Sequence, residues 1–457
     1  MRSGLGETQQ MTKTVLVLGA GPAGGAVALG LRRLGYAVTV IAQPRPFAAV
    51  EGISERVVAG LRAAGFSAAL TAIAEPSARN AHWNGASNSA NTEQLVDRQA
   101  LDAGIWRDLQ QAGVRCISAR VTGITHSAGQ VSVQFAPTSL STSPGELSGC
   151  FLVEARGRQA PSAGLSRLRG SQTVSLLQYW QGPAAAPQSA AVSFADGWAW
   201  LAMTAQGRRY LQLTLDVAST ALPAKAELTA FCRQRFAALP QAVPFMARAE
   251  PVGDVQARTS TAVLCEAVVG ERWIRVGDAA MAVDPLSGNG IFQALSSALQ
   301  APAVINTLLQ HPERAALARQ FHQSRVEALF LRFARMGRDF YQLEQQWPAE
   351  PFWQTRRQWP DQQPMHQACS FAEFEVQTLP VVQGAQIIAR PVVVTPDQPL
   401  GVWHLAGVEL APLVEVVRGR AAGVSLRCCL ADQGLSGEPL VQLWQWFRQQ
   451  GVAELSE

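Results

Sequence analysis

Lysine is almost missing from this chain of 457 residues. Two of its 38 basic residues are lysine, Lys13 and Lys225, and the arginines that supply the rest are scattered along the sequence. A protein that binds nucleic acid needs a run or patch of basic residues for the phosphate backbone, so the sequence argues against such a partner. The net charge of +4 is therefore a matter of composition.

The sequence also lacks paired cysteines, a long apolar run and a secretory signal. The seven cysteines form no C-x-x-C pair, which gives no sign of a zinc site or of a disulfide framework. Such thiols fit a reducing cytoplasm. No run of 18 apolar residues occurs, and the first ten residues lack the apolar segment of a secretory signal. We expect a soluble, cytoplasmic protein with no metal and no place in a membrane.

The chain does contain enough apolar side chains for a large core. Hydrophobic residues make up 48% of it and charged residues 16%, as in compact globular proteins. At about 150 residues per domain, this length predicts two or three domains. Residues 1–12 are polar and are expected to form a disordered leader before the first strand.

A glycine-rich motif follows the first apolar run, residues 14–18, and precedes helical spacing over 26–35 and an apolar run at 37–41. The motif reads Gly19-Ala-Gly21-Pro-Ala-Gly24, which in this context predicts a dinucleotide site. Gly19 permits the tight turn, Gly21 lets backbone N–H groups approach a pyrophosphate, and Gly24 allows close helix–strand packing. The acid that usually grips the ribose is missing, so Gln43 or Arg45 is expected to replace it. A glycine-rich turn without a nucleotide is the alternative.

A second, more specific segment occupies residues 276–290. It reads V-G-D-A-A-M-A-V-D-P-L-S-G-N-G, with a strand expected before Asp278, whose carboxylate can accept a flavin ribityl hydroxyl. Pro285 sets a rigid turn, and Gly288, Asn289 and Gly290 open the next helix. The N-terminus of a helix stabilises the negative charge that gathers on a reduced flavin. A helix cap without any ligand is the alternative.

Taken in order, these motifs resemble a known family. Together with V-D-R at 96–98 and V-E-A-R-G-R at 153–158, they are similar to those of the FAD-dependent aromatic hydroxylases and their flavin-dependent halogenase relatives, over residues 13–340. The resemblance implies FAD as the cofactor and places Arg98 on the flavin side of the pocket, where a surface helix-capping charge is the alternative. Glu51 lies where the halogenases keep a Gly-Glu-Ser turn.

The resemblance leaves two reactions to weigh, halogenation and hydroxylation. Halogenases carry a lysine beyond that turn, but residues 52–224 contain none, so halogenation is not expected. Oxygen chemistry remains: a flavin C4a-hydroperoxide, formed with O2, would hydroxylate an aromatic ring. Hydroxylases often have Asp-Gly where this chain has Arg156-Gly157, so the electron source stays open between NAD(P)H and reduced flavin from a separate reductase.

Four side chains are candidates for contact with the substrate or the reacting atoms. Trp198 and Trp200 have strand spacing and would form a substrate wall, or else simply pack against neighbours. His82, beside Trp83, is one catalytic candidate, with a surface histidine as its alternative. Glu51 is the other, with a hydrogen-bonding role beside the flavin as its alternative.

The predicted fold is α/β, with a Rossmann-like FAD-binding domain, an inserted β-sheet substrate domain and a mostly helical, winged-helix-like C-terminal module. We expect the FAD-binding domain to comprise residues 13–170 and 261–345, and its second part to contain a long helix over about 290–344. The substrate sheet would take 171–260, and a partner-binding module 346–457. A Pro- and Gln-rich patch at 347–364 marks the last boundary.

A small-molecule hydroxylase does not need such a tail, so a protein partner is expected. The tail mixes both signs of charge, which does not favour DNA. With a halogenase-like core that lacks the lysine, the chain resembles the flavoprotein monooxygenases that mature the tryptophylquinone cofactor of quinohemoprotein amine dehydrogenase. This implies hydroxylation of a tryptophan side chain in a partner polypeptide. A small-aromatic hydroxylase and a flavin-holding interaction protein without turnover are the alternatives.

Overall fold

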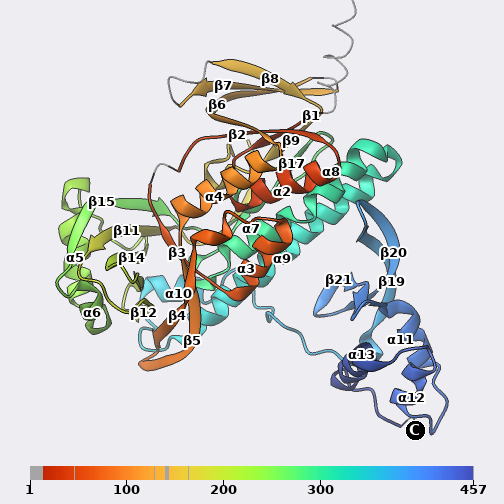
Figure 1. Cartoon of the computed structure of the whole chain (residues 1–457). Coiled ribbons are helices and arrows are strands. Elements are labelled where there is room, and N and C mark those ends of the chain that lie inside the picture. Colours follow the sequence, from red (N-terminus) through yellow and green to blue (C-terminus); the bar gives the residue numbers. More distant parts are fainter. Residues whose placement is uncertain (1–13, 46, 128, 139–143, 163, 456–457) are drawn as a thin grey trace, which may run out of the picture.

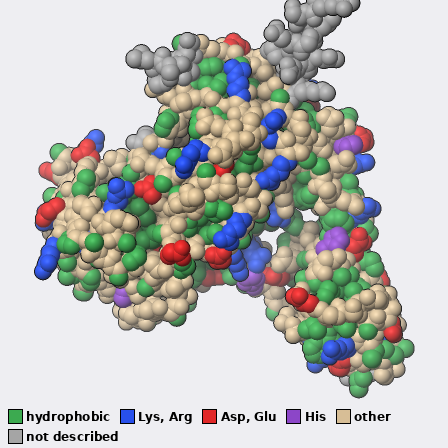
Figure 2. Space-filling view, viewed as in Figure 1, with side chains coloured by type: hydrophobic (Ala, Val, Ile, Leu, Met, Phe, Trp, Pro, Cys, Tyr) green, Lys and Arg blue, Asp and Glu red, His purple; other side chains and the backbone are tan. Residues whose placement is uncertain are grey.

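The structure is a computed structural model, and it describes residues 14–45, 47–127, 129–138, 144–162 and 164–455 (Figure 1). The leader expected at 1–12 lies outside these residues. Within the described ranges no helix is long and apolar enough to cross a membrane. The charged side chains on the face seen in Figure 2 are interspersed and do not gather by sign.

A seven-stranded sheet carries the nucleotide-binding motifs, with the order β17-β9-β1-β2-β6-β7-β8. Its first five strands are parallel, and β7 and β8 add to it antiparallel. The bounds are β1 Thr14–Leu18, β2 Ala37–Ala42, β6 Arg115–Ser127, β7 Gln130–Pro137, β8 Gly145–Gly149, β9 Phe151–Glu154 and β17 Trp273–Arg275. The strands β1 and β9 are buried almost throughout, as a parallel sheet covered by helices requires.

Five helices pack around this sheet: α2 Pro22–Arg33, α3 Glu55–Ala64, α4 Arg98–Gln111, α7 Gly290–Ala298 and α8 Ala301–Gln310. Their apolar faces and the sheet form one buried cluster. The long helix expected over 290–344 is divided into α7, α8 and α9 (Ala315–Leu343). Pro302 and Pro312 stand in the first turns after the breaks, where a missing N–H costs nothing.

An eight-stranded sheet forms the second layer, with the order β15-β11-β14-β13-β12-β4-β5-β3. Its bounds are β3 Val50–Ile53, β4 Ile73–Trp83, β5 Ala86–Asp97, β11 Thr173–Gln181, β12 Gln188–Phe194, β13 Gly197–Met203, β14 Arg208–Asp216 and β15 Glu250–Thr259. The helices α5 (Leu228–Ala237) and α6 (Val243–Met246) cover one face with a cluster of buried apolar side chains. Strands β3 to β5 therefore join the substrate sheet although they precede residue 171, and the predicted domain boundaries stay a prediction.

The C-terminal module is tied to the body by a β-hairpin. Strands β19 (Glu375–Gln383) and β20 (Gln386–Thr395) run from helix α8 to the module, where β21 (Gln398–Val402) completes a three-stranded sheet (Figure 1). At the body end, the Ile387 N–H donates to Thr307 Oγ1 at 2.8 Å. The remaining elements are β22 His404–Leu405, β23 Val408–Glu409, α11 Leu410–Arg418, α12 Leu426–Ala431 and α13 Gly437–Gln449. They share a separate buried core.

Small elements complete the described fold. A three-stranded sheet of β10 (Arg167–Arg169), β16 (Val263–Cys265) and β18 (Met281–Ala282) packs against α9, and α10 (Pro351–Arg356) precedes the C-terminal module. The Arg356 side chain, 4% exposed, pairs with Asp216 at 3.1 Å and so fixes α10 to the large sheet. The predicted α/β class, with a Rossmann-type sheet and a helical C-terminal part, is confirmed.

Candidate functional site

A cavity of about 1210 Å³ lies between the two large sheets. One wall is the end of the parallel sheet with its glycine-rich turns, and the other is a face of the eight-stranded sheet. This volume exceeds that of most pockets for a single small ligand, so it can hold a dinucleotide together with part of a second molecule. Ligands of open α/β sheets bind at this carboxyl edge of the strands.

The first glycine-rich turn leaves room beside the N-terminus of α2. Gly21 is its N-cap, lines the cavity, and has no neighbour where a side chain would begin. Gly19 adopts a φ of 106°, which favours glycine. Gly24 is not in the lining, and a Cβ there would collide with the Gly19 carbonyl. The turn therefore presents free N–H groups to the cavity, as a pyrophosphate requires.

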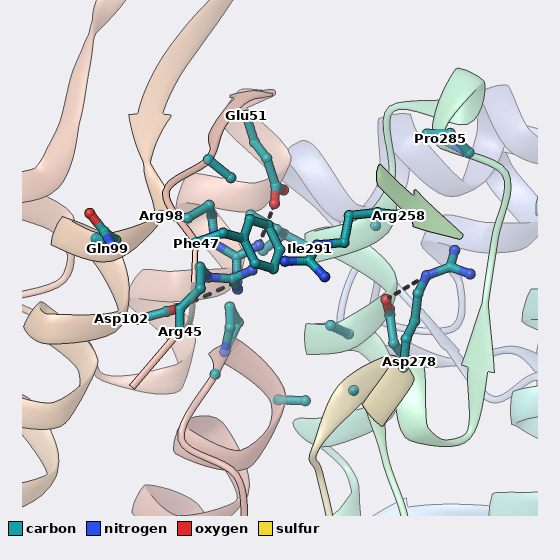
Figure 3. A pocket seen from close by; sticks show the side chains of 18 of the residues that line it. Arg45, Phe47, Glu51, Arg98, Gln99, Asp102, Arg258, Asp278, Pro285 and Ile291 are labelled. Carbon is teal, nitrogen blue, oxygen red and sulfur yellow. Dashed lines mark hydrogen bonds and ion pairs between the residues drawn. The ribbon is translucent and has the colours of Figure 1, made fainter. Parts of the chain in front are cut away.

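The second segment meets the first across β9 and β17. The Gly277 N–H donates to Ser297 Oγ at 2.9 Å, which anchors the turn to α7. Asp278 lines the cavity 3.5 Å from the Arg158 guanidinium (Figure 3). Burial raises the pKa of Asp278, while Arg158 opposes the rise. A carboxylate at this position, beside the end of a parallel strand, can accept a hydrogen bond from a hydroxyl group of the ribityl chain of a flavin.

The Asp284–Pro285 turn follows at the same wall. Asp284 accepts hydrogen bonds from the Leu286 N–H at 2.9 Å and the Tyr341 hydroxyl at 3.0 Å. Pro285 and both glycines at 288 and 290 line the cavity, and nothing lies where a Cβ of either glycine would stand. Asn289 is the N-cap of α7 but is not in the lining, since its amide turns back to the Ser287 carbonyl. The N-terminus of α7 thus opens on the cavity.

Arg98 and Glu51 form an ion pair inside the cavity (Figure 3). Arg98 is the first residue of α4, and its Nη2 also lies 3.3 Å from Asp102 Oδ1. Burial disfavours its charge, but the nearby Glu51 and Asp102 carboxylates outweigh this and raise its pKa. The buried Arg98 Nε has no partner among the described residues. Such an orphan donor fits an acceptor atom on a bound ligand.

The opposite wall is aromatic. Trp198 and Trp200, on β13, and Tyr210, on β14, all line the cavity, and the Trp200 and Tyr210 rings lie 5.7 Å apart, edge to face. Phe47 and Arg258 add a cation–π contact with 3.9 Å from guanidinium carbon to ring centroid (Figure 3). Tyr210, Phe47 and Arg258 belong to no motif, so sequence reasoning missed them, although Tyr210 lies within the predicted substrate sheet. These side chains come close to one another only in the folded protein, where the strands pair in the sheet.

The remaining predicted residues divide between the cavity and its outside. Gln43 lines the cavity at the end of β2, next to Arg45, which pairs with Asp102 at 3.0 Å. His82 lies outside the lining, where its Nδ1 is 2.8 Å from Ser87 Oγ within the β4–β5 hairpin. The residues that line the cavity include no lysine. No metal-binding group of His, Cys, Asp or Glu side chains occurs in the described part of the chain.

Comparison with known proteins places the chain in a family. No family model matches it, and neither does any curated protein sequence. The solved structure of CmlS, a flavin-dependent halogenase, is 17% identical with a TM-score of 0.74 and covers 96% of this chain and 95% of its own. The myxobacterial chondrochloren halogenase CndH is 21% identical with a TM-score of 0.63, covering 76% of this chain and 86% of its own. These two show the fold.

The fold is that of the flavin halogenase and hydroxylase class. A nearer structure is peptidyl tryptophan dihydroxylase QhpG, which is essential for tryptophylquinone cofactor biogenesis. It is 51% identical with a TM-score of 0.83, and the match covers 97% of this chain and all of QhpG. The chain belongs to the QhpG family of flavin-dependent monooxygenases. The resemblance inferred from its motifs is confirmed.

Proposed function

We propose that this monooxygenase hydroxylates a tryptophan side chain of a partner polypeptide during tryptophylquinone biogenesis. The observation that carries the proposal is the 51% identity, over nearly the whole of both chains, to a peptidyl tryptophan dihydroxylase. The cavity supports it, because an aromatic wall faces the flavin-binding turns and can stack an indole ring. Bound FAD, once reduced, would activate O2, which would supply the oxygen atom that is transferred.

Different residues of the cavity bind the cofactor, position the substrate and accept a proton. The turns at Gly21 and Gly288 hold the cofactor, and Asp278 and Arg98 bind its polar atoms. Trp200 and Tyr210 position the indole ring, which must stay out of water during the transfer. An oxygenated ring carbon then has to lose a proton to become aromatic again. We assign this proton to Glu51 Oε2, because Glu51 Oε1 is engaged by Arg98.

The absence of lysine from the cavity lining supports hydroxylation and not halogenation. For the electron source we propose reduced flavin from a separate reductase, because Arg156 stands where the hydroxylases have an aspartate. Its guanidinium is engaged by Glu154, with contacts of 2.5 and 3.0 Å. A cytoplasmic location is proposed as well, since the seven cysteines are free thiols.

The test uses the purified holoenzyme, chemically reduced flavin, O2 and the polypeptide that carries the tryptophan. We expect mass spectrometry to find oxygen added to a tryptophan of the partner, with the label retained when ¹⁸O2 is used. Free tryptophan and simple phenols with NAD(P)H form the second arm. Product in that arm alone would replace the proposal with a small-molecule hydroxylase, and flavin oxidation without product in either arm would refute it.

A further inference from the structure

An aromatic cluster connects the wall of the cavity with the surface of the molecule. It includes Trp198 on β13, Tyr341 on α9, Trp353 on α10, and Trp347 and Trp83 at its outer edge. The first three are 3%, 2% and 0% exposed, whereas the last two are half-buried. Of these five side chains, Trp198 alone lines the cavity. The flavin-binding and substrate-binding roles described above use none of the other four.

Neighbouring rings in this cluster are close throughout. The Trp198 Nε1–H donates to the Tyr341 hydroxyl at 3.3 Å. The ring centroids of Tyr341 and Trp353 are 5.9 Å apart. Trp353 stacks on Trp347 with 5.9 Å between centroids and 24° between planes, and Trp83 lies 5.4 Å from Trp353. Because electron tunnelling falls off exponentially with distance, such contacts allow rapid transfer from ring to ring.

Tyr341, the next ring after Trp198, also has a proton acceptor beside it. The Tyr341 hydroxyl donates to Asp284 Oδ1 at 3.0 Å. Burial raises the pKa of Tyr341 well above its usual value, so the phenol keeps its proton until it is oxidised. Burial also raises the pKa of Asp284, which makes this carboxylate a better proton acceptor. A tyrosine can give up an electron readily only when its proton has somewhere to go.

We propose that Trp198, Tyr341, Trp353 and Trp347 form a one-electron relay between the flavin cavity and the surface. Such a relay reduces a one-electron oxidant that forms in the cavity and does not react with the substrate. The oxidant is a one-electron acceptor in the cavity, an oxygen radical or light-excited oxidised flavin. It gains one electron from Trp198, whose ring becomes a radical.

Each later step restores the previous residue. Tyr341 returns an electron to Trp198 and passes its hydroxyl proton to Asp284. Trp353 then reduces Tyr341, which takes the proton back, and Trp347 reduces Trp353. The sum moves one electron from Trp347 to the oxidant and no proton. A thiol in solution supplies the electron that restores Trp347.

Packing alone does not account for this arrangement. Aromatic pairs stabilise a core by about 0.5–1.5 kcal/mol each, and phenylalanine or leucine would fill the same space. Packing requires neither a tyrosine hydroxyl directed at a carboxylate nor a series that begins in a cavity and ends at the surface.

The relay is tested by transient absorption after flash excitation of oxidised flavin in the holoenzyme. In the wild type we expect a long-lived tryptophan radical. Tyr341→Phe removes one hydroxyl and should shorten the charge-separated lifetime about tenfold, the equivalent of about 1.4 kcal/mol. Tyr36→Phe is the matched control, because Tyr36 is also buried and hydrogen-bonded but lies between α2 and β2, outside the relay. Equal lifetimes in the wild type and Tyr341→Phe would overturn the relay.

A second readout needs no kinetics. After aerobic illumination of the holoenzyme, peptide mass spectrometry should find added oxygen chiefly on Trp347. In Trp353→Phe the damage should shift to Trp198, whereas Trp180→Phe, a buried tryptophan of the other sheet face, should leave the pattern unchanged. Thermal melts establish that each variant is folded. The same distribution of added oxygen over the tryptophans in the wild type and in Trp353→Phe would refute the proposal.

Discussion

Arg98 and Glu51 form an ion pair that joins the start of α4 to strand β3 within the flavin cavity. The Arg98 backbone N–H also donates to the Ala49 carbonyl at 2.8 Å, so backbone and side chain hold the same junction. The Arg98 side chain is 10% exposed, and its removal would leave Glu51 without its cation. The pair therefore couples the stability of the fold to the geometry of the site.

Arg98→Met should lower the free energy of unfolding by about 1–2 kcal/mol, because it leaves the partly exposed Glu51 and Asp102 carboxylates without their cation. It should also weaken FAD binding. Urea unfolding and titration by flavin fluorescence measure the two effects. Arg62→Met is the control, since the Arg62–Glu55 pair is exposed on both sides and worth about 0.5 kcal/mol at most. Wild-type stability and affinity in Arg98→Met would contradict this expectation.

Gly21→Ala and Gly24→Ala should separate cofactor binding from folding. A methyl group at Gly21 meets no protein atom but stands where a pyrophosphate approaches, so FAD affinity should fall about tenfold, or about 1.4 kcal/mol, at unchanged thermal stability. A methyl group at Gly24 strikes the Gly19 carbonyl and should destabilise the fold by about 2 kcal/mol. Thermal melts of the apoprotein measure the stability of each variant, and FAD titrations measure its affinity for the cofactor. The same pair of results for Gly21→Ala and Gly24→Ala would contradict the separate roles of the two glycines.

Glu51→Gln and His82→Ala compare the two catalytic candidates. Glu51→Gln keeps an acceptor for Arg98 but loses the base, and we expect the rate at which the aromatic hydroxylated product forms in a single turnover to fall about a hundredfold. His82→Ala should react as the wild type does, because His82 lies outside the cavity lining. Both variants should bind FAD normally. A loss of product in His82→Ala alone would transfer the catalytic role to His82.

Trp200→Ala should weaken the complex with the partner polypeptide by about 2 kcal/mol, or about 30-fold, because the substrate indole is expected to pack against the Trp200 ring on the cavity wall. Trp200→Phe retains a ring and should recover most of the affinity. Isothermal titration with the polypeptide measures both, and FAD binding serves as the internal control. Equal affinities for Trp200→Ala and the wild type would place the substrate elsewhere in the cavity.

Local patterns in the sequence were sufficient for the fold class and the flavin-facing turns. The β-α-β spacing around Gly19 and the G-D-A and D-P elements around Asp278 are contiguous, so their meaning does not depend on tertiary packing. The division of the stretch over 290–344 was missed because Pro302 and Pro312 begin new helices there. Proline at a first turn is compatible with the periodicity on either side.

The substrate wall could not be read from the sequence in the same way. Trp200 and Tyr210 face each other because β13 pairs with β14, with Ala202 opposite Tyr210, and that register is a tertiary property. Strands β4 and β5 were missed since residues 86–92 are polar and exposed and show no alternation. His82 was chosen for its residue type, and only the hairpin geometry places it beside Ser87.

His322 makes the stability of the flavin site depend on pH. Its Nε2–H donates to the Arg275 carbonyl at 2.9 Å and so clamps β17, just before Gly277, to α9. Burial lowers the pKa of His322 to about 4, against about 6.5 in the unfolded chain. The unfolded state therefore takes up a proton first as the pH falls, and the contribution to stability is complete above pH 6.5 and declines towards pH 4.

His322→Gln retains a donor for the Arg275 carbonyl but cannot be protonated. Between pH 7.5 and pH 4.5 the wild type should therefore lose about 2–3 kcal/mol more of its unfolding free energy than the variant does. Urea denaturation at both pH values measures the difference, and subtraction of the two curves removes the shared contribution of the carboxylates. His404→Gln, at a half-exposed histidine of the C-terminal module, should show no such difference from the wild type. Parallel pH curves for the wild type and His322→Gln would mean that His322 can accept a proton in the folded state without loss of its bond to β17.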